Sequence, residues 1–162
     1  MTTLPDLRFL LRHPAHFVAL GFGSGLARKA PGTFGTLIGL PLFAILMALP
    51  EPAHLPIIAL LFLIGIPVCT RAGSALGVSD HGSIVWDEIV AMLLVLEFTP
   101  RHWIWWLVAF GLFRLFDIWK PAPIRQFDAR LKGGFGVMFD DLLAALYAIA
   151  TLKALQWLTL HF

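Results

Sequence analysis

Residues 52–70 read PAHLPIIALLFLIGIPVCT and contain no Asp, Glu, Lys or Arg. A second charge-free stretch, residues 30–50, lies before this one and is separated from it only by Glu51. Each stretch is about 20 residues long, which as an α-helix would cross a hydrocarbon layer of roughly 30 Å. We therefore expect two membrane-spanning helices here.

The overall composition favours a membrane protein over a soluble one. Apolar residues make up 59% of the 162 residues and charged residues 14%, against about 45–50% and about 25% in a typical soluble domain. This apolar content excludes a disordered chain, and the single cysteine, Cys69, excludes an intrachain disulfide framework. The net charge of +2 is too small to indicate a nucleic-acid partner, so none is expected.

Three further apolar runs complete the predicted fold. Ile89–Leu96 and Trp103–Phe113 are short, so each is either a short span or half of a hairpin that crosses only part of the bilayer. Leu142–Phe162 is interrupted only by Lys153. Residues 7–12 combine leucines with two arginines, which is typical of a short helix on a membrane surface.

The predicted fold class is therefore all-α: an integral membrane helical bundle of four to five apolar helices plus an N-terminal interfacial helix. A single membrane-embedded domain would cover residues 1–162, because the chain has no linker or low-complexity tract. With five crossings and a cytoplasmic N-terminus, ten of the twelve Lys and Arg residues fall on the cytoplasmic side. The exceptions are Arg101, outside, and Lys153, within a span. This bias predicts a multi-pass membrane protein.

Six of the ten acidic residues are expected on this same side, although they come from three separate helix ends. They are Asp80, Asp87 and Glu88 before the run at 89–96, Asp117 after the run at 103–113, and Asp140 and Asp141 at the start of the last helix. Gathering so many carboxylates is costly unless cations neutralise them. Hard oxygen ligands suit Mg²⁺ or a similar divalent ion. The alternative is that these pairs are ordinary charges at helix N-termini.

Asp117 does not fit that alternative, because a carboxylate is unfavourable at a helix C-terminus. Arg114 and Lys120 lie three residues before and after it, on the same helical face. The row is therefore either a salt-bridge ladder or a metal ligand between two cations that bind phosphate.

Two glycine-rich segments adjoin these charges. Thr33, within Pro31-Gly32-Thr33, is a candidate N-cap for the first long helix, where free N–H groups bind anions. The alternative there is that the glycines only allow close helix packing. Residues 133–136 read GGFG and would form either a flexible loop or a backbone cradle beside the last acidic pair.

These motifs, taken in order, resemble the phosphatidylglycerophosphatase A family. The resemblance is carried by GFGSGL at 21–26, PGT at 31–33, DHGSIVWDE at 80–88, FRLFDIWKP at 113–121 with Pro123 and Ile124, and GGFGVMFDD at 133–141. Two positions that are usually glycine in the family are Ala91 and Ala145 here, a small-for-small change that should preserve close packing. The resemblance implies a bacterial inner-membrane, Mg²⁺-dependent enzyme that removes the terminal phosphate of phosphatidylglycerol phosphate, leaving phosphatidylglycerol.

The resemblance and the charge pattern together suggest a role for each site residue. The expected ligands of one or two Mg²⁺ ions are Asp87, Glu88, Asp117, Asp140 and Asp141. Asp140 or Asp141 would take a proton from the attacking water, and Lys120 would neutralise the transferring phosphate; a covalent aspartyl-phosphate is the alternative. The expected substrate contacts are Ser24, Lys29, Gly32, Thr33, Asp80, Arg114 and Gly134.

The expected partner is a phospholipid substrate in the inner leaflet, met by a site on the cytoplasmic face. The competing function class is a cation transporter or channel, which also uses membrane carboxylates. That class predicts acids near the middle of the spans, whereas these acids lie at the ends of the apolar runs. The sequence leaves the oligomeric state open.

Overall fold

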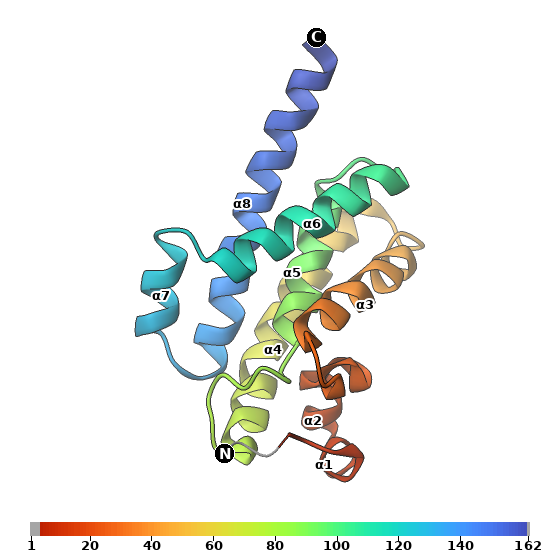
Figure 1. Cartoon of the computed structure of the whole chain (residues 1–162). Helices are drawn as coiled ribbons and strands as arrows, with labels where there is room; N and C mark the ends of the chain where they lie inside the picture. The colour runs from red at the N-terminus through yellow and green to blue at the C-terminus, as the bar shows by residue number, and fades with distance from the viewer. Residues whose placement is uncertain (1–3, 162) are drawn as a thin grey trace.

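Helices make up the architecture of residues 4–161, which are the residues that the computed structural model describes (Figure 1). In chain order they are α1 (Leu7–Leu11), α2 (Pro14–Ala19), a 3-10 segment (Gly21–Leu26), α3 (Pro31–Leu46), a 3-10 turn (Glu51–Ala53), α4 (His54–Leu76), α5 (Trp86–Glu97), α6 (Trp103–Trp119), α7 (Ile124–Arg130) and α8 (Gly133–His161). Strands are absent from these residues, which confirms the prediction of an all-α fold.

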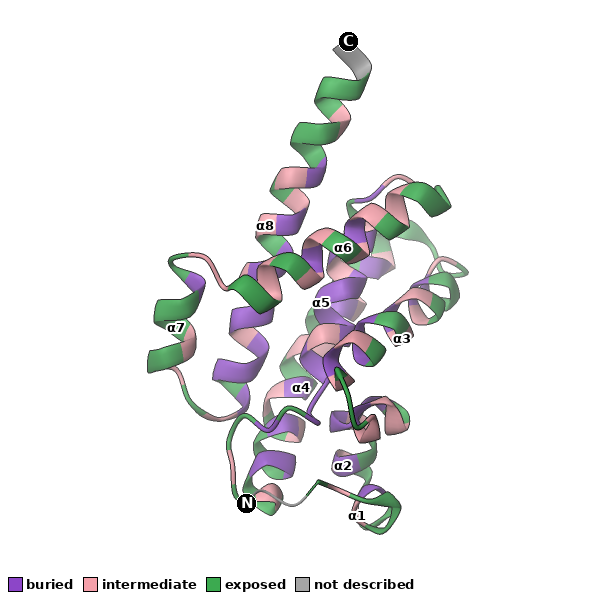
Figure 2. Cartoon of the chain, in the orientation of Figure 1, coloured by how far each residue is buried: buried purple, intermediate pink, exposed green. Residues whose placement is uncertain are grey.

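α5 is the central helix of the bundle. Nine of its twelve residues are buried, and it packs against α3, α4, α6 and α8 (Figure 2). A helix that is apolar on all sides is stable only when other helices surround it. At about 18 Å it is too short to cross a bilayer, so the run at 89–96 forms the core of the bundle.

The helix contacts bring several helix ends together. α3 and α5 run parallel, because Gly35 packs on Val85 and Gly39 packs on Met92. α4 runs the opposite way, since its first residue, His54, pairs with the last residue of α5. The starts of α3 and α5 therefore lie at the same end of the bundle, together with the end of α4.

α6 and α8 add their polar ends to this same region. Early in α6, Trp106 stacks edge-on against Phe43 near the end of α3, whereas Arg114 near the end of α6 reaches Glu88 at the start of α5. The backbone N–H of Gly134, at the start of α8, donates a hydrogen bond to Thr70 in the last third of α4. This arrangement confirms that acidic segments distant in sequence meet at one end.

Two helices are long and apolar enough to cross a membrane. They occupy Glu51–Leu76 and Gly133–Thr159, and α3 is a shorter apolar helix of 16 residues. α4 exposes large apolar side chains, among them Leu60 and Leu63, which suits a lipid-facing surface. Among the described residues only these two helices meet the length expected of a span, so the predicted bundle of four to five apolar membrane helices stays a prediction.

The N-terminal region forms two short helices. α1 begins after Asp6, whose carboxylate accepts a hydrogen bond of 2.8 Å from the N–H of Phe9, as expected for an N-cap. Leu7 and Leu11 are exposed, whereas Leu10 is buried. The predicted helix at residues 7–12 is confirmed as α1, and its position on a membrane surface stays a prediction.

Two predicted helix starts are wrong. α3 begins at Pro31 with Ala30 at the N-cap position, so Thr33 lies inside the first turn and is not the N-cap; proline is favoured at the first helical position because it lacks the N–H. α8 begins at Gly133, so GGFG is the first turn of a helix, and neither a loop nor a cradle. Asp140 and Asp141 consequently lie about two turns inside α8, and the predicted end of this helix, Phe162, lies outside the described residues.

Candidate active site

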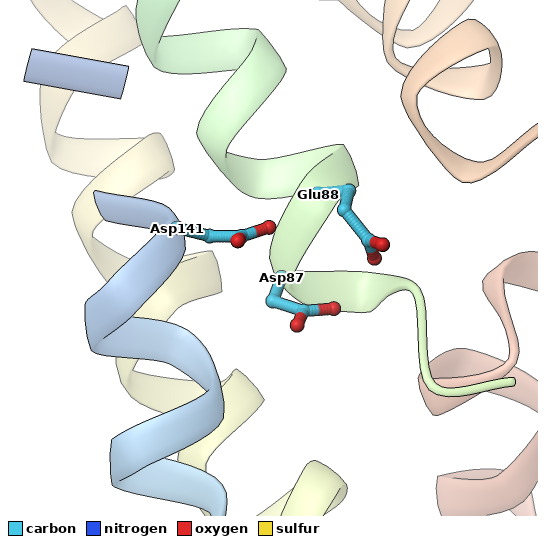
Figure 3. Close-up of side chains that lie close together, drawn as sticks. All are labelled: Asp87, Glu88 and Asp141. Carbon is cyan, nitrogen blue, oxygen red and sulfur yellow. The ribbon is translucent and has the colours of Figure 1, made fainter. Parts of the chain in front are cut away.

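Three carboxylates from two helices form the centre of the site. Asp87 and Glu88 belong to the first turn of α5, and Asp141 projects from α8 toward them (Figure 3). One oxygen from each carboxylate lies within 4.8 Å of the others. We call Asp87, Glu88 and Asp141 the acid cluster. Asp87 and Asp141 are only 8% and 3% exposed, so these charges are largely removed from water.

The acid cluster lacks hydrogen-bond partners for several of its oxygens. Within the described part of the chain, one buried oxygen each of Asp87, Glu88 and Asp141 has no partner, and neither has Oδ1 of Asp140. Burial raises the pKa of Asp87 and that of Glu88, and the negative charges around them add to both shifts. Buried carboxylates without partners cost free energy, which a hard divalent cation would offset. The donor set therefore fits Mg²⁺.

Arg114 provides positive charge on one side of the acid cluster. Its Nη1 donates to Oδ2 of Asp117, three residues later on α6, and lies 3.7 Å from Oε1 of Glu88. The pairing explains how a carboxylate is tolerated near the C-terminus of α6, and it confirms the predicted contact between Arg114 and Asp117. The Asp117 side chain also neighbours that of Asp141.

Lys120 provides positive charge on the other side. It is the C-cap of α6, in the left-handed conformation with φ of 45°, so the chain turns away just before Pro121. Its Nζ lies 2.5 Å from Oδ2 of Asp140 and 3.3 Å from Oδ2 of Asp128. Burial acts to lower the pKa of Lys120, but the hydrogen bond to Asp140 and the nearby acid charges raise it overall. Of the two predicted alternatives, the salt-bridge ladder does not continue through Lys120, because Lys120 pairs with α7 and α8 instead of Asp117.

Asp128 is a residue of the site that the sequence did not single out. It lies on α7, between Arg125 and Arg130, and has the appearance of an ordinary charge on a solvated helix. The turn after Lys120 brings α7 to the site; Pro121 marks the end of α6 in the sequence, but it does not indicate the direction in which the chain continues.

Gly32 lies against the acid cluster with no space for a side chain. A Cβ atom at this position would overlap Oε1 of Glu88 and lie 3.0 Å from Nη1 of Arg114. The Gly32 carbonyl accepts a hydrogen bond of 2.8 Å from the buried hydroxyl of Thr36. Thr33 follows Gly32 directly and is half-buried. The structure therefore brings the Pro31-Gly32-Thr33 backbone to the acids, as predicted.

The other predicted substrate contacts do not bond to the acids. The Ser24 hydroxyl donates to the Gly21 carbonyl at 2.9 Å, and Lys29 is exposed. Asp80 is exposed and lines a small cleft beside Asp128. Gly134 packs on the backbone of α4, where its N–H is already used. A role for these four residues in substrate binding stays a prediction.

Comparison with known proteins assigns the chain to one family of phosphatases. A family model described as Phosphatidylglycerophosphatase A matches residues 17–156, which include every residue of the site. A Haemophilus influenzae protein named phosphatidylglycerophosphatase A is 49% identical over 94% of this chain and 95% of its own length. A protein of the same name from Escherichia coli K12 is 40% identical over 94% of this chain and 92% of its own length. No solved structure matches the chain.

Proposed function

The chain belongs to the phosphatidylglycerophosphatase A family, and we propose that it is a Mg²⁺-dependent lipid phosphatase. Its reaction would hydrolyse the terminal phosphomonoester of phosphatidylglycerol phosphate to phosphatidylglycerol and phosphate, in phospholipid biosynthesis. One observation carries the proposal: three carboxylates, two buried and one half-buried, have oxygens within 4.8 Å of one another, with unpaired oxygens and with Arg114 and Lys120 close by.

We propose that the acid cluster binds Mg²⁺. Asp87, Glu88 and Asp141 present the hard oxygen donors that this ion prefers. When bound, Mg²⁺ would polarise the phosphoryl group and lower the pKa of an attacking water. Asp117 and Asp140 were also predicted as ligands, but each already accepts a hydrogen bond from a cation. We therefore propose that Asp117 and Asp140 lie beside the Mg²⁺ ligands and position the two cations without binding the ion.

Arg114 and Lys120 are the proposed phosphate-binding cations. The Nε atom of Arg114 is buried and has no partner among the described residues, which leaves a donor for a phosphoryl oxygen. Lys120 has three N–H donors, and its carboxylate partners are Asp140 and Asp128. Both cations would neutralise the charge of the transferring group, where electrostatic stabilisation has its largest effect.

Asp140 is the proposed general base. Its Oδ2 accepts a hydrogen bond from Lys120, whereas its buried Oδ1 has no partner in the described structure and can accept a proton. Asp141 is less suited to this role because it belongs to the acid cluster. The Lys120 contact holds Asp140 in one orientation, which a base requires if its free oxygen is to face the attacking water.

The site is proposed to open to the cytoplasmic face of a bacterial inner membrane, in a chain that crosses it several times. Bacterial relatives and two helices of spanning length support a membrane location. The predicted excess of Lys and Arg on one side supports the orientation. In this arrangement the phosphate of an inner-leaflet lipid meets the acid cluster at headgroup depth, so the lipid need not leave the bilayer.

The test is phosphate release from phosphatidylglycerol phosphate in mixed micelles, with purified, metal-stripped protein before and after Mg²⁺ is added. We expect activity only with the ion, and a loss of about 10²-fold or more in kcat for Asp141→Asn. Asp6→Asn is the matched control, because Asp6 only caps α1. Full turnover without a divalent ion would contradict the proposal. Cation flux through liposomes without phosphate release would support the transporter alternative.

A further inference from the structure

We propose that an apolar groove between α4, α5 and α8 holds one acyl chain of the lipid substrate. The proposal rests on the proposed function and adds the part of the site that recognises the hydrocarbon. The groove has a volume of about 400 Å³, within the range of about 300–1,000 Å³ that ligand pockets occupy. Its walls include Leu55, Ala59 and Phe62 of α4, Val90 and Leu94 of α5, and Leu142 of α8.

Asp87 connects this groove to the acid cluster. It is the one charged residue that lines the groove, and it is also one of the three clustered carboxylates. Val90 and Leu94 follow Asp87 by three and seven residues, on the same side of α5. The groove therefore extends for about 10 Å along α5 from the acid cluster. A lipid with its phosphate at the acids would place its glycerol and chain along this path.

The direction of the groove matches the orientation of a lipid. α5 begins at the end of the bundle that carries the acids and runs away from it. If the acids lie at headgroup depth, Val90 and then Leu94 lie progressively deeper in the bilayer. A chain that follows them extends toward the bilayer centre, as the chain of any inner-leaflet lipid does.

The groove is also reachable from the side. Leu55, Ala59 and Leu63, on the α4 wall, are exposed, and α4 is one of the two helices of spanning length. A chain could therefore enter from the surrounding hydrocarbon without crossing water. The lining is apolar apart from Asp87, so a polar occupant would lose its hydrogen bonds there.

An acyl chain fits this volume better than a helix from a second copy does. A helix about 10 Å wide occupies roughly 800 Å³ over a 10 Å length. The groove holds about half of that volume. A single hydrocarbon chain is much thinner than a helix, so it can lie along the groove without moving the walls apart.

The test fills the groove and compares two substrates. Ala59→Phe places a ring in the groove from an exposed position, and Ala154→Phe makes the same change at an exposed position of α8 that does not line it. We expect Ala59→Phe to lower kcat/KM for dioleoyl phosphatidylglycerol phosphate by about tenfold, since excluding two methylenes suffices for this. The loss should be much smaller for the dihexanoyl substrate, and Ala154→Phe should behave as wild type on both.

A second measurement does not depend on turnover. Phosphatidylglycerol phosphate with a photoreactive diazirine in one acyl chain should label wild-type peptides from α4 and α5, and Ala59→Phe should reduce this labelling. Equal activity of the two variants on the dioleoyl substrate, or labelling spread evenly over all exposed helices, would overturn the groove proposal. If labelling were confined to the groove but the protein released no phosphate, the proposed function would be overturned, whereas the groove proposal would stand.

Discussion

Gly32→Ala tests whether the position of the acid cluster determines the activity. In most helices this substitution is favourable, because alanine has a higher helix propensity than glycine by about 1 kcal/mol. At Gly32 the new methyl group would overlap Oε1 of Glu88 and lie 3.0 Å from Nη1 of Arg114. The neighbouring atoms are the ends of flexible side chains, so we expect the helix to form and the two charged groups to move.

The size of the effect follows from this overlap. Ordinary contact with a methyl group begins near 3.4 Å, so the Glu88 carboxylate must move by about 1 Å, and a displacement of that size in a catalytic group can cost about 10²-fold in rate. Because Glu88 belongs to the acid cluster, the apparent affinity for Mg²⁺ should fall as well. We expect kcat to fall by about 10²-fold, with no loss of thermal stability.

The assay is phosphate release as a function of Mg²⁺ concentration, combined with a thermal unfolding curve of the same preparation. Gly111→Ala is the matched control, since Gly111 is an exposed position inside α6 with nothing within 4 Å of a new Cβ. This variant should keep full activity and gain up to about 1 kcal/mol of stability. If Gly32→Ala turned over substrate as fast as Gly111→Ala, the contact between Gly32 and Glu88 would be irrelevant to catalysis and our reasoning would be refuted.

Three further predictions concern other contacts. Lys120→Ala should lower kcat for phosphate release by about 10²–10³-fold. Arg101→Ala removes an exposed ion pair near the start of α4 and should leave phosphate release unchanged. Equal effects of the two substitutions would argue against a role for Lys120. His54→Leu leaves Glu97 without its hydrogen-bond partner at 2.9 Å and should lower the melting temperature of the detergent-solubilised protein, so an unchanged melting temperature would contradict a stabilising role for this contact. Gly134→Val would force a side chain into the α4 backbone, and size-exclusion chromatography should show a lower yield of folded protein; a normal yield would show that this contact is dispensable.

The sequence predicted the helices and the meeting of the acids for a clear physical reason. Charge-free runs such as residues 52–70 leave polar residues only at their ends, and adjacent runs that reverse direction bring alternate ends to one side. Asp87 and Asp141 are 54 positions apart, yet one oxygen of each lies within 4.8 Å of the other. The hydrophobic pattern, together with the assumption that successive runs alternate in direction, predicted this convergence.

The sequence could not predict where packing overrides local preference. Glycine has a low helix propensity, so residues 133–136 indicated a loop or a backbone cradle and not a helix. In the structure Gly134 lies against the backbone of α4, a contact that only a residue without a side chain permits, and this packing extends α8 to Gly133. Lys120 is similar, because its left-handed conformation is rare outside glycine. Its contacts with Asp140 and Asp128 depend on that turn.

The run at 89–96 was predicted to be a short span or half of a hairpin, whereas the structure shows a buried core helix. Periodicity alone does not identify a buried core helix when nearly all sides of the run are apolar. Whether the run is buried depends on the helices that pack around it, and the sequence of the run does not reveal them. α5 is buried because α3, α4, α6 and α8 pack around it.

The positions of the carboxylates depend on the glycines that allow the helices to pack closely. Around α5, a Cβ on Gly35 would lie 2.6 Å from Val85, and a Cβ on Gly65 would lie 2.6 Å from Met138 and 2.8 Å from Trp86. Val85 and Trp86 immediately precede Asp87, and Met138 lies one turn before Asp141. Helices in a bilayer gain little from the hydrophobic effect when they associate and depend on close backbone approach. The glycines therefore set the distance between the helices that carry the carboxylates, and a larger residue at Gly35 or Gly65 would move the carboxylates apart without replacing any of them.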